Sequence, residues 1–244
     1  MKKVFTKAFL GLCALGTSAV AFAQDAVPVA EESFHQALKI YFIEGSADFM
    51  SLIAIPMIIG LGFVLERIIY LNLADTNTDK LLRGIEAALD KGDVEAAKAI
   101  ARNTRGPIAS ISYQGLMRID QGIDVVEKSI ISYGGVQSGL LEKNLSWITL
   151  FIAIIPSIGF LGTVVGMILS FNDIEIAGDI SPTVVAGGMK VALITTVAAL
   201  ISAIILQLFY NYLLSKLEAI LNKMEDASIS LLDAIIKYNV KYKN

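Results

Sequence analysis

Two threonines and one lysine are the side chains whose type and position suggest chemistry inside a membrane. Thr163 lies in an uncharged stretch at 147–171, and Thr196 lies in a second one at 191–215, directly preceded by Lys190. Threonine hydroxyls in an apolar helix can line a polar path, or they can bond back to a carbonyl of their own helix. A lysine at this depth is a candidate for an electrostatic role, because burying its charge is costly. The alternatives are that it snorkels to the interface or forms a structural ion pair.

The same two stretches carry small residues at helical spacing. Each stretch is longer than the about 20 residues that a bilayer-spanning helix needs. Small residues let membrane helices approach closely, because apolar burial gives little driving force for helix association in lipid. The glycines that we expect at helix contacts are Gly159, Gly162, Gly166 and Gly188.

The composition limits the chemistry that this chain can perform. It has 244 residues and is 55% hydrophobic, which is typical of a membrane protein rather than of an ordinary soluble domain. Cys13 is the single cysteine and His35 is the single histidine, so an intrachain disulfide or a Cys- or His-based metal cluster is not expected. We therefore predict a protein that is not an enzyme, with no catalytic residues, no cofactor, no metal and no nucleic-acid partner.

The chain begins with a pattern that is typical of a signal peptide. Residues 1–23 have a basic start, a short apolar core and the small-x-small sequence Ala21-Phe22-Ala23. The alternative is an uncleaved membrane anchor. Residues 24–47 follow as an amphipathic segment, in which Phe34, Leu38 and Tyr41 share one face. This segment either lies in the membrane interface or is a short solvated helix.

The rest of the chain predicts an all-α polytopic membrane protein with three long transmembrane helices. The predicted segments are a first span at 48–73, a charged helical domain at 74–146, a second span at 147–171, a loop at 172–182, a third span at 183–212 and a C-terminal helix at 213–244. Within the charged domain, Asp93 is a predicted N-cap and 125–145 is predicted to be one helix. Ser181-Pro182 predicts a helix start, and the C-terminal helix is expected to continue the third span.

The distribution of positive charge predicts the orientation. Lysine and arginine are frequent in 67–146 and in the C-terminal tail, whereas the 172–182 loop contains only acidic charges. Because positive residues accumulate on the cytoplasmic side, we expect the helical domain and the C-terminus to be cytoplasmic. The 172–182 loop and the mature N-terminus are then expected to be periplasmic, in a multi-pass protein of the bacterial inner membrane.

Two motifs in these spans resemble a known family. The stretch Pro156-Ser-Ile-Gly-Phe-Leu-Gly-Thr-Val-Val-Gly-Met167 is similar to the second transmembrane signature of the MotA/TolQ/ExbB proton-channel family. The stretch Gly188-Met-Lys-Val-Ala-Leu-Ile-Thr-Thr-Val-Ala-Ala-Leu200 is similar to its third-helix signature. The pair Glu66-Arg67, which ends the uncharged run of the first span, also fits. Three spans with one large loop resemble ExbB and TolQ more than MotA, which has four spans.

The resemblance implies a function and a set of partners. It implies a homo-oligomeric ring, a pentamer, around an ExbD- or TolR-like single-span protein that supplies a pore aspartate. Thr163 and Thr196 match the family threonines that line the pore near this aspartate. A TonB-like protein would carry the work to outer-membrane transporters. One departure is that Val191 occupies a position where many members have a glutamate.

The prediction that follows is a proton-channel stator subunit of an ExbB-ExbD-type inner-membrane motor. Such a motor uses the proton motive force to energise TonB-dependent outer-membrane transport. Two alternatives stay open: a TolQ-like subunit for envelope maintenance, and a membrane scaffold without an ion path. Transport of another ion also stays open.

Overall fold

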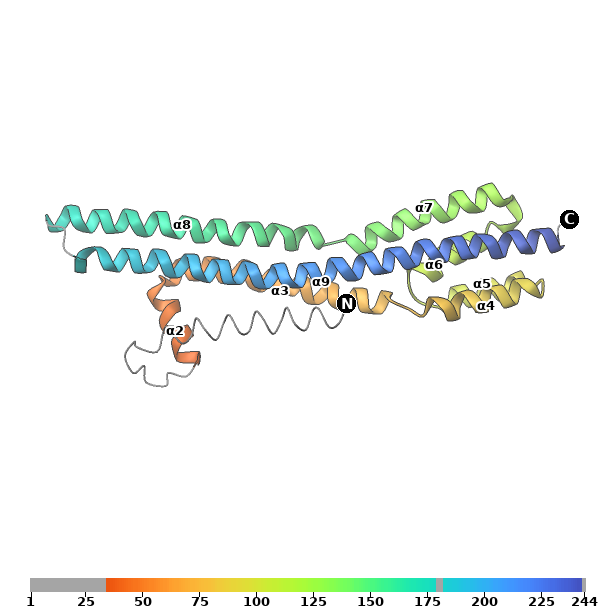
Figure 1. Ribbon diagram of the computed structural model, residues 1–244, viewed down its shortest axis with the longest axis horizontal. Coiled ribbons are helices and arrows are strands. Elements are labelled where there is room, and N and C mark those ends of the chain that lie inside the picture. Colours follow the sequence, from red (N-terminus) through yellow and green to blue (C-terminus); the bar gives the residue numbers. More distant parts are fainter. Residues whose placement is uncertain (1–33, 179–181, 243–244) are drawn as a thin grey trace, which may run out of the picture. The chain divides into compact units, whose positions relative to one another are not determined.

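The computed structural model describes residues 34–178 and 182–242, and the predicted signal peptide at 1–23 lies outside them. The elements are α2 (Phe34–Glu44), α3 (Ala47–Ala74), α4 (Thr78–Asp90), α5 (Val94–Asn103), α6 (Pro107–Leu116), η1 (Ile119–Gln121), α7 (Ile123–Glu142), α8 (Leu145–Ala177) and α9 (Pro182–Tyr242) (Figure 1). No strand occurs in this described part, so the predicted all-α class is confirmed. Residues up to Ile43 and residues from Glu44 onward form two units, and the three long helices all belong to the second unit.

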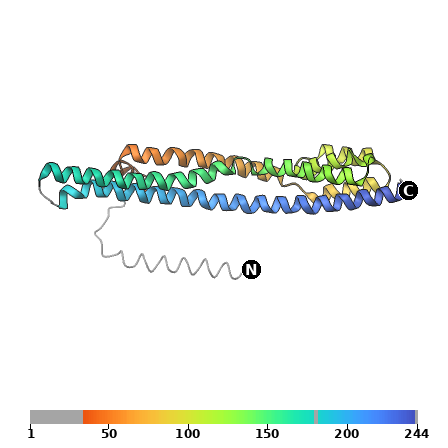
Figure 2. The same ribbon diagram turned by 90° about the horizontal axis from the view of Figure 1, so that it is seen from above.

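Three of the described helices are long and apolar enough to cross a membrane, namely α3, α8 and α9. Helix α9 contains 61 residues without interruption, which corresponds to about 90 Å at 1.5 Å per residue. This length is about three times the hydrocarbon thickness of a bilayer. The prediction that the C-terminal tail continues the third span is therefore confirmed, since one helix contains both (Figure 2).

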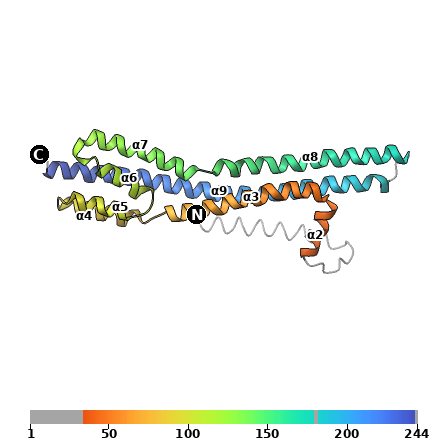
Figure 3. The same ribbon diagram turned by 180° about the vertical axis from the view of Figure 1, so that it is seen from behind.

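The three long helices alternate in direction. Helix α8 runs antiparallel to α9 along most of its length, and α3 lies along the same pair (Figure 3). Contacts of α3 with α9 keep a constant offset: Gly60 lies against Leu206, and Lys216 Nζ donates to Asn72 Oδ1. Because the offset is constant, α3 and α9 are parallel. On the α8 side, the ring of Phe63 stacks 6.2 Å from that of Trp147.

The charged region between α3 and α8 folds around the second half of α9. Two of its helices, α4 and α5, begin at side-chain caps: the Asn77 side chain accepts from the Lys80 amide at 3.1 Å, and the Asp93 side chain accepts from the Ala96 amide at 2.9 Å. The predicted Asp93 cap is therefore confirmed. Apolar residues along one face of the C-terminal half of α9 are buried in one core with α4, α6 and α7; the larger ones are Leu217, Ile220, Met224, Leu231 and Ile235.

Two predicted helix boundaries differ from the structure. The helix expected at 125–145 ends at Glu142, and α8 begins at Leu145 after Asn144, which has a left-handed φ of 67°. Asparagine tolerates this conformation better than most residues, and its side-chain amide donates to Glu66 at 3.2 Å. Much of the loop expected at 172–182 is helical, because α8 continues to Ala177. It ends at Gly178, where a φ of 67° favours glycine.

The C-terminal end of α9 is hydrogen-bonded to the end of α4, next to the turn between α4 and α5. Tyr242 Oη and Lys241 Nζ each donate to the carbonyl oxygen of Asp90 at 2.8 Å. The Tyr242 ring covers Gly92, which has a φ of 80°. The two bonds satisfy a carbonyl at the C-terminal end of α4, where helical partners are lacking.

Replacing Tyr242 by alanine is expected to loosen this turn while leaving the spans intact. The loss of one neutral hydrogen bond and its ring contact should cost about 1 kcal/mol of local stability. Hydrogen exchange at the amides of residues 91–93 measures the effect directly. Lys237→Ala on the exposed side of the same helix is the control, and equal exchange in both variants would show that the fastening contributes nothing.

Candidate functional site on the α8–α9 pair

Helices α8 and α9 approach each other through a contact of small residues. The predicted packing glycines all lie in it: a Cβ built on Gly159 would lie 2.4 Å from Ala199 Cβ, and one on Gly166 would lie 2.8 Å from the Gly188 carbonyl oxygen. A Cβ on Gly162 would lie 2.7 Å from Thr195 Oγ1. These separations are shorter than carbon contacts allow, so the two backbones come as close as they do because these side chains are absent.

Neighbouring threonines of α9 have different environments. Thr195 is fully buried and faces Gly162, and its hydroxyl lies 3.0 Å from carbonyls of its own helix. Thr196 is half-buried, and its hydroxyl lies 3.1 Å from the carbonyl oxygen of Ala192 and 3.3 Å from that of Gly159 on α8. A hydroxyl has one proton, so Thr196 can donate within its helix or across to α8. Thr195 therefore serves packing, while Thr196 lies at the edge of the contact.

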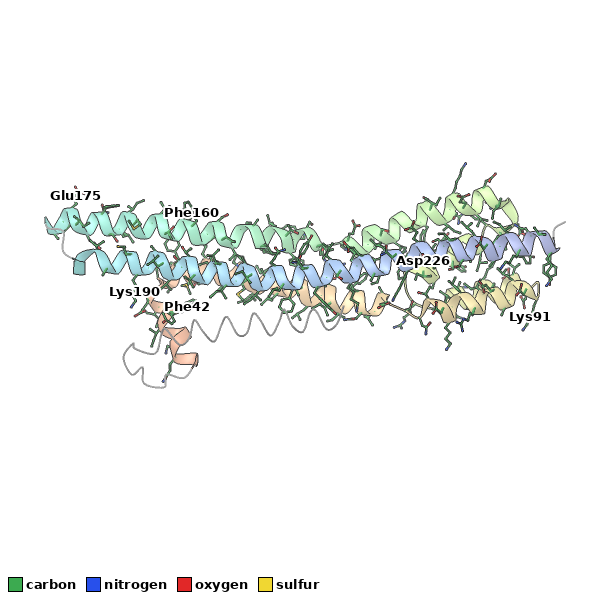
Figure 4. The ribbon with its side chains drawn as sticks, viewed as in Figure 1. Phe42, Lys91, Phe160, Glu175, Lys190 and Asp226 are labelled. Carbon is green, nitrogen blue, oxygen red and sulfur yellow. The ribbon has the colours of Figure 1, made fainter. Side chains whose placement is uncertain are left out.

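Thr163 lies on the same edge from the α8 side. Thr163 is four residues after Gly159, which places the two residues about 40° apart around α8. Gly159 is the residue whose carbonyl oxygen lies 3.3 Å from the Thr196 hydroxyl. Its hydroxyl donates to the carbonyl oxygen of Phe160 at 2.6 Å, and Phe160 itself is 69% exposed (Figure 4). Both threonine hydroxyls thus border the contact, and each is engaged with a backbone carbonyl.

Lys190 lies away from this edge and has an acidic partner. Its Nζ lies 2.5 Å from Glu44 Oε1, and the two side chains are 55% and 32% exposed. It is six residues from Thr196, which corresponds to about 120° around α9. An ion pair that is exposed to water contributes little to stability, and its contribution rises as the surrounding water is removed. The structure therefore pairs Lys190 with the segment that precedes α3 rather than with the two threonines.

A second polar cluster lies where α3 passes the break between α7 and α8. Arg67 is only 3% exposed; its Nε donates to Glu66 Oε2 at 2.7 Å and its Nη1 donates to the Leu140 carbonyl at 3.3 Å. The guanidinium also lies 4.5 Å from the centre of the Tyr70 ring. In the sequence, this charged pair ends the uncharged run of the first span and fits the family pattern. That position was the available signal, but the Leu140 carbonyl and the Asn144 amide that the pair binds lie more than 70 residues away.

The α8–α9 edge offers hydroxyl and carbonyl dipoles rather than titratable groups. Among the residues that the structure describes, no group of three or more His, Cys, Asp or Glu side chains is placed to hold a metal ion. Such dipoles can order water and pass hydrogen bonds, but they do not ionise near neutral pH. A proton-carrying group at this edge would have to come from another chain.

Comparison with known proteins gives consistent matches. The model of the MotA/TolQ/ExbB proton channel family matches residues 103–226, just over half of the chain. A biopolymer transport protein ExbB homolog of Methanothermobacter thermautotrophicus is 28% identical over 176 residues, which cover 71% of this chain and 62% of that protein. Biopolymer transport protein exbB1 of Vibrio cholerae is 38% identical over 89 residues, 33% of this chain and 39% of its own length.

A further relative gives a match of similar extent. Biopolymer transport protein ExbB of Helicobacter pylori is 32% identical over 83 residues, 34% of this chain and 57% of its own length. The chain thus spans less than two thirds of each of these relatives. The family match covers α6, α7, α8 and most of α9, and it therefore includes both Thr163 and Thr196.

Proposed function

The chain belongs to the MotA/TolQ/ExbB proton channel family, and on this premise we propose that it is the stator subunit of an ExbB-ExbD-type motor. In this proposal the motor lies in the bacterial inner membrane and uses the proton motive force to energise TonB-dependent outer-membrane transport. The observation that carries it is that Thr196 and Gly159, from the two signature segments, meet in the α8–α9 contact. Thr163 borders the same contact.

The proposed partners follow from what this site lacks. Several copies of the chain, a pentamer by resemblance, would form a ring with the Thr163–Thr196 edges turned inward. An ExbD- or TolR-like single-span protein would supply the aspartate that exchanges protons, since α8 and α9 carry no carboxylate near these threonines. A TonB-like protein would receive the work. The mature N-terminus is periplasmic and the C-terminus cytoplasmic in this arrangement.

The direction of the three helices supports this topology. Because α3 and α9 are parallel and α8 is antiparallel to both, consecutive spans can cross one bilayer in alternating directions. The charged helices α4–α7 then lie on the same side as the C-terminal half of α9, with which they share a core. No enzymatic role is proposed, because the reaction needs only ion movement coupled to motion.

Thr163→Val and Thr196→Val test this function. The complex with its co-purifying single-span partner is reconstituted in liposomes, and proton flux is followed with an internal pH dye. Valine has nearly the shape of threonine but no hydroxyl, so each change should reduce partner-dependent flux by about tenfold without altering assembly. Thr195→Val is the matched control, because the hydroxyl of that buried neighbour faces the helix contact. Unchanged flux in both variants would contradict the proposal.

A specific observation favours the scaffold alternative. The Thr163 hydroxyl is engaged in a 2.6 Å bond to its own helix, as expected of a threonine that serves helix structure alone. In a scaffold, all three threonine variants would be silent and no aspartate-bearing partner would co-purify. The identity of the partner distinguishes the TolQ-like alternative from the ExbB-type function. Mass spectrometry of the complex purified in mild detergent would identify that partner.

A further inference from the structure

We propose that Gln207 and Asn211 position water along the charged-domain half of the ion path, in a groove between α8 and α9 that opens beside Glu142. This inference rests on the proposed function and adds residues that the family signatures at 156–167 and 188–200 do not include. It concerns how an ion travels from the Thr163–Thr196 edge to the end of the apolar segments.

A hollow between the two helices provides the space. It has a volume of about 660 Å³, and its polar lining comes from Glu142, Ser146, Thr149 and Tyr210. A single water needs only about 30 Å³, so several waters fit. The three polar lining residues from 142–149 are exposed, so the hollow is open along one side. The rest of its lining, Leu145, Leu150, Ala153, Leu214 and Leu217, is apolar, so the four polar side chains are the positions at which waters in the hollow can be bound.

Gln207 and Asn211 extend this polar lining toward Thr196. Both side chains are exposed, and Gln207 Nε2 donates to Asn211 Oδ1 at 3.3 Å. Gln207 lies seven residues before Leu214, which lines the hollow, and eleven residues after Thr196. Both separations bring residues to within about 20° of one another on a helix. Thr196, Gln207 and the hollow thus share one side of α9.

The α8 side carries a matching series of hydroxyls. Thr149 lies about 40° around α8 from Thr163 and about 21 Å along it, since fourteen residues separate them. On α9, fifteen residues separate Asn211 from Thr196, or about 22 Å. The polar groups of both helices therefore cover the same distance, from the threonine edge to the hollow.

Around the rest of α9 at this depth, the exposed side chains are largely apolar. Among residues 204–212 they are Ile204, Leu208 and Phe209, at 58%, 66% and 40% exposure, and Tyr212, which carries a hydroxyl on a large ring and is 52% exposed. Amide side chains that face lipid would lose their hydrogen bonds with water, which is costly. Two exposed amides four residues apart on an otherwise apolar helix therefore indicate a side that contacts water or polar protein groups.

The chemistry suits a water file that moves protons or other small cations. An amide both donates and accepts hydrogen bonds and does not titrate, so it can orient waters without trapping the ion. The carboxylate of Glu142 at the open end attracts cations there. Gln207 and Asn211 are positioning residues in this scheme, because they act on water rather than on the aspartate of the partner.

Flux through the reconstituted complex with its single-span partner tests the assignment. The double variant Gln207→Leu and Asn211→Leu should reduce proton flux by about tenfold, because leucine removes the amides and fills the space that water would occupy. Replacing both residues by serine keeps a small polar group and should restore most of the flux. Tyr212→Leu is the matched control: it removes an exposed polar group next to Asn211, about 100° around the helix.

Thiol labelling gives a second readout that does not depend on flux. In a Cys13→Ser background, Gln207→Cys and Leu208→Cys are treated in the intact complex with a charged, membrane-impermeant maleimide. We expect Gln207→Cys to react and Leu208→Cys to stay unmodified, although both positions are exposed in a single chain. This readout also serves if the leucine variant fails to assemble.

The outcomes separate this inference from the proposed function. Full flux in the double leucine variant, or an unreactive Gln207→Cys, overturns the inference; if Thr196→Val still reduces flux as expected, the proposed function stands. Absence of flux in the unmodified complex with its partner overturns both. Loss of flux with reactivity at Gln207→Cys alone supports the path.

Discussion

Replacing Gly188 by alanine is expected to separate α8 from α9, whereas the same change at the adjacent Gly187 should be tolerated. A Cβ on Gly188 would lie 2.5 Å from the Gly166 carbonyl oxygen and close to Ser170 Oγ, so one helix backbone must move. Nothing lies within 4 Å of a Cβ on Gly187. We expect Gly188→Ala to lower the free energy of unfolding by about 3 kcal/mol, which is near the upper end for overpacking of a close contact.

The matched pair removes the ambiguity of helix propensity. Alanine favours a helix over glycine by up to about 1 kcal/mol at either position, so propensity alone predicts that both variants gain stability. The thermal unfolding midpoint in mild detergent should therefore fall for Gly188→Ala and stay level or rise for Gly187→Ala. A compensating change, Ser170→Gly, removes the side chain nearest to the new methyl group and should recover part of the loss. Equal midpoints for the two alanine variants would show that the close approach at Gly188 does not hold the helices together.

Arg67→Met should destabilise the junction of α3 with the α7–α8 break by about 2 kcal/mol. Methionine keeps much of the volume but leaves the Leu140 carbonyl without the guanidinium and Glu66 without its nearest cation. The figure stays below that of a fully buried ion pair, because Glu66 is 45% exposed and water can partly replace its partner. Arg67→Lys should not rescue the loss, since an ammonium cannot reach Glu66, Leu140 and the Tyr70 ring together.

A surface pair provides the comparison for Arg67. Lys98 lies 2.8 Å from Glu95, which is 84% exposed, so Glu95→Gln should change stability by no more than about 0.5 kcal/mol. The readouts are the unfolding midpoint in detergent and the rate of proteolysis at residues 143–144. If the Arg67→Met variant is cleaved at the same rate and unfolds at the same midpoint as the unmodified protein, the contacts of Arg67 do not hold the break between α7 and α8 in place.

The positions of the spans and the family could be predicted because they depend on local composition. Uncharged stretches of sufficient length predict the cores of α3, α8 and α9 whatever the neighbours are, and the motif around Thr163 needs no coordinates to be matched. The Asp93 cap and the continuous α9 were likewise local, since they depend on capping chemistry and on the absence of a helix breaker. The spacing of the glycines also predicted which face of α8 would make the close contact with another helix.

What depended on contacts between distant residues could not be predicted in this way. The break at Asn144 looks like helix in the sequence and becomes a turn where the Glu66–Arg67 pair of α3 meets it. Thr195 and Thr196 have the same type and adjacent positions, and only the location of α8 buries one hydroxyl and leaves the other at the edge.

By itself, then, the sequence determined the helical periods, the spans and the family, because these follow from residue type at short range. Only the tertiary structure decided which hydroxyls and charges lie together: Lys190 with Glu44, Tyr242 with Asp90, and Tyr210 with Thr149 in one hollow. The physical reason is that a helix presents residues in every direction. The neighbouring helix decides which of these directions are packed and which remain open to water.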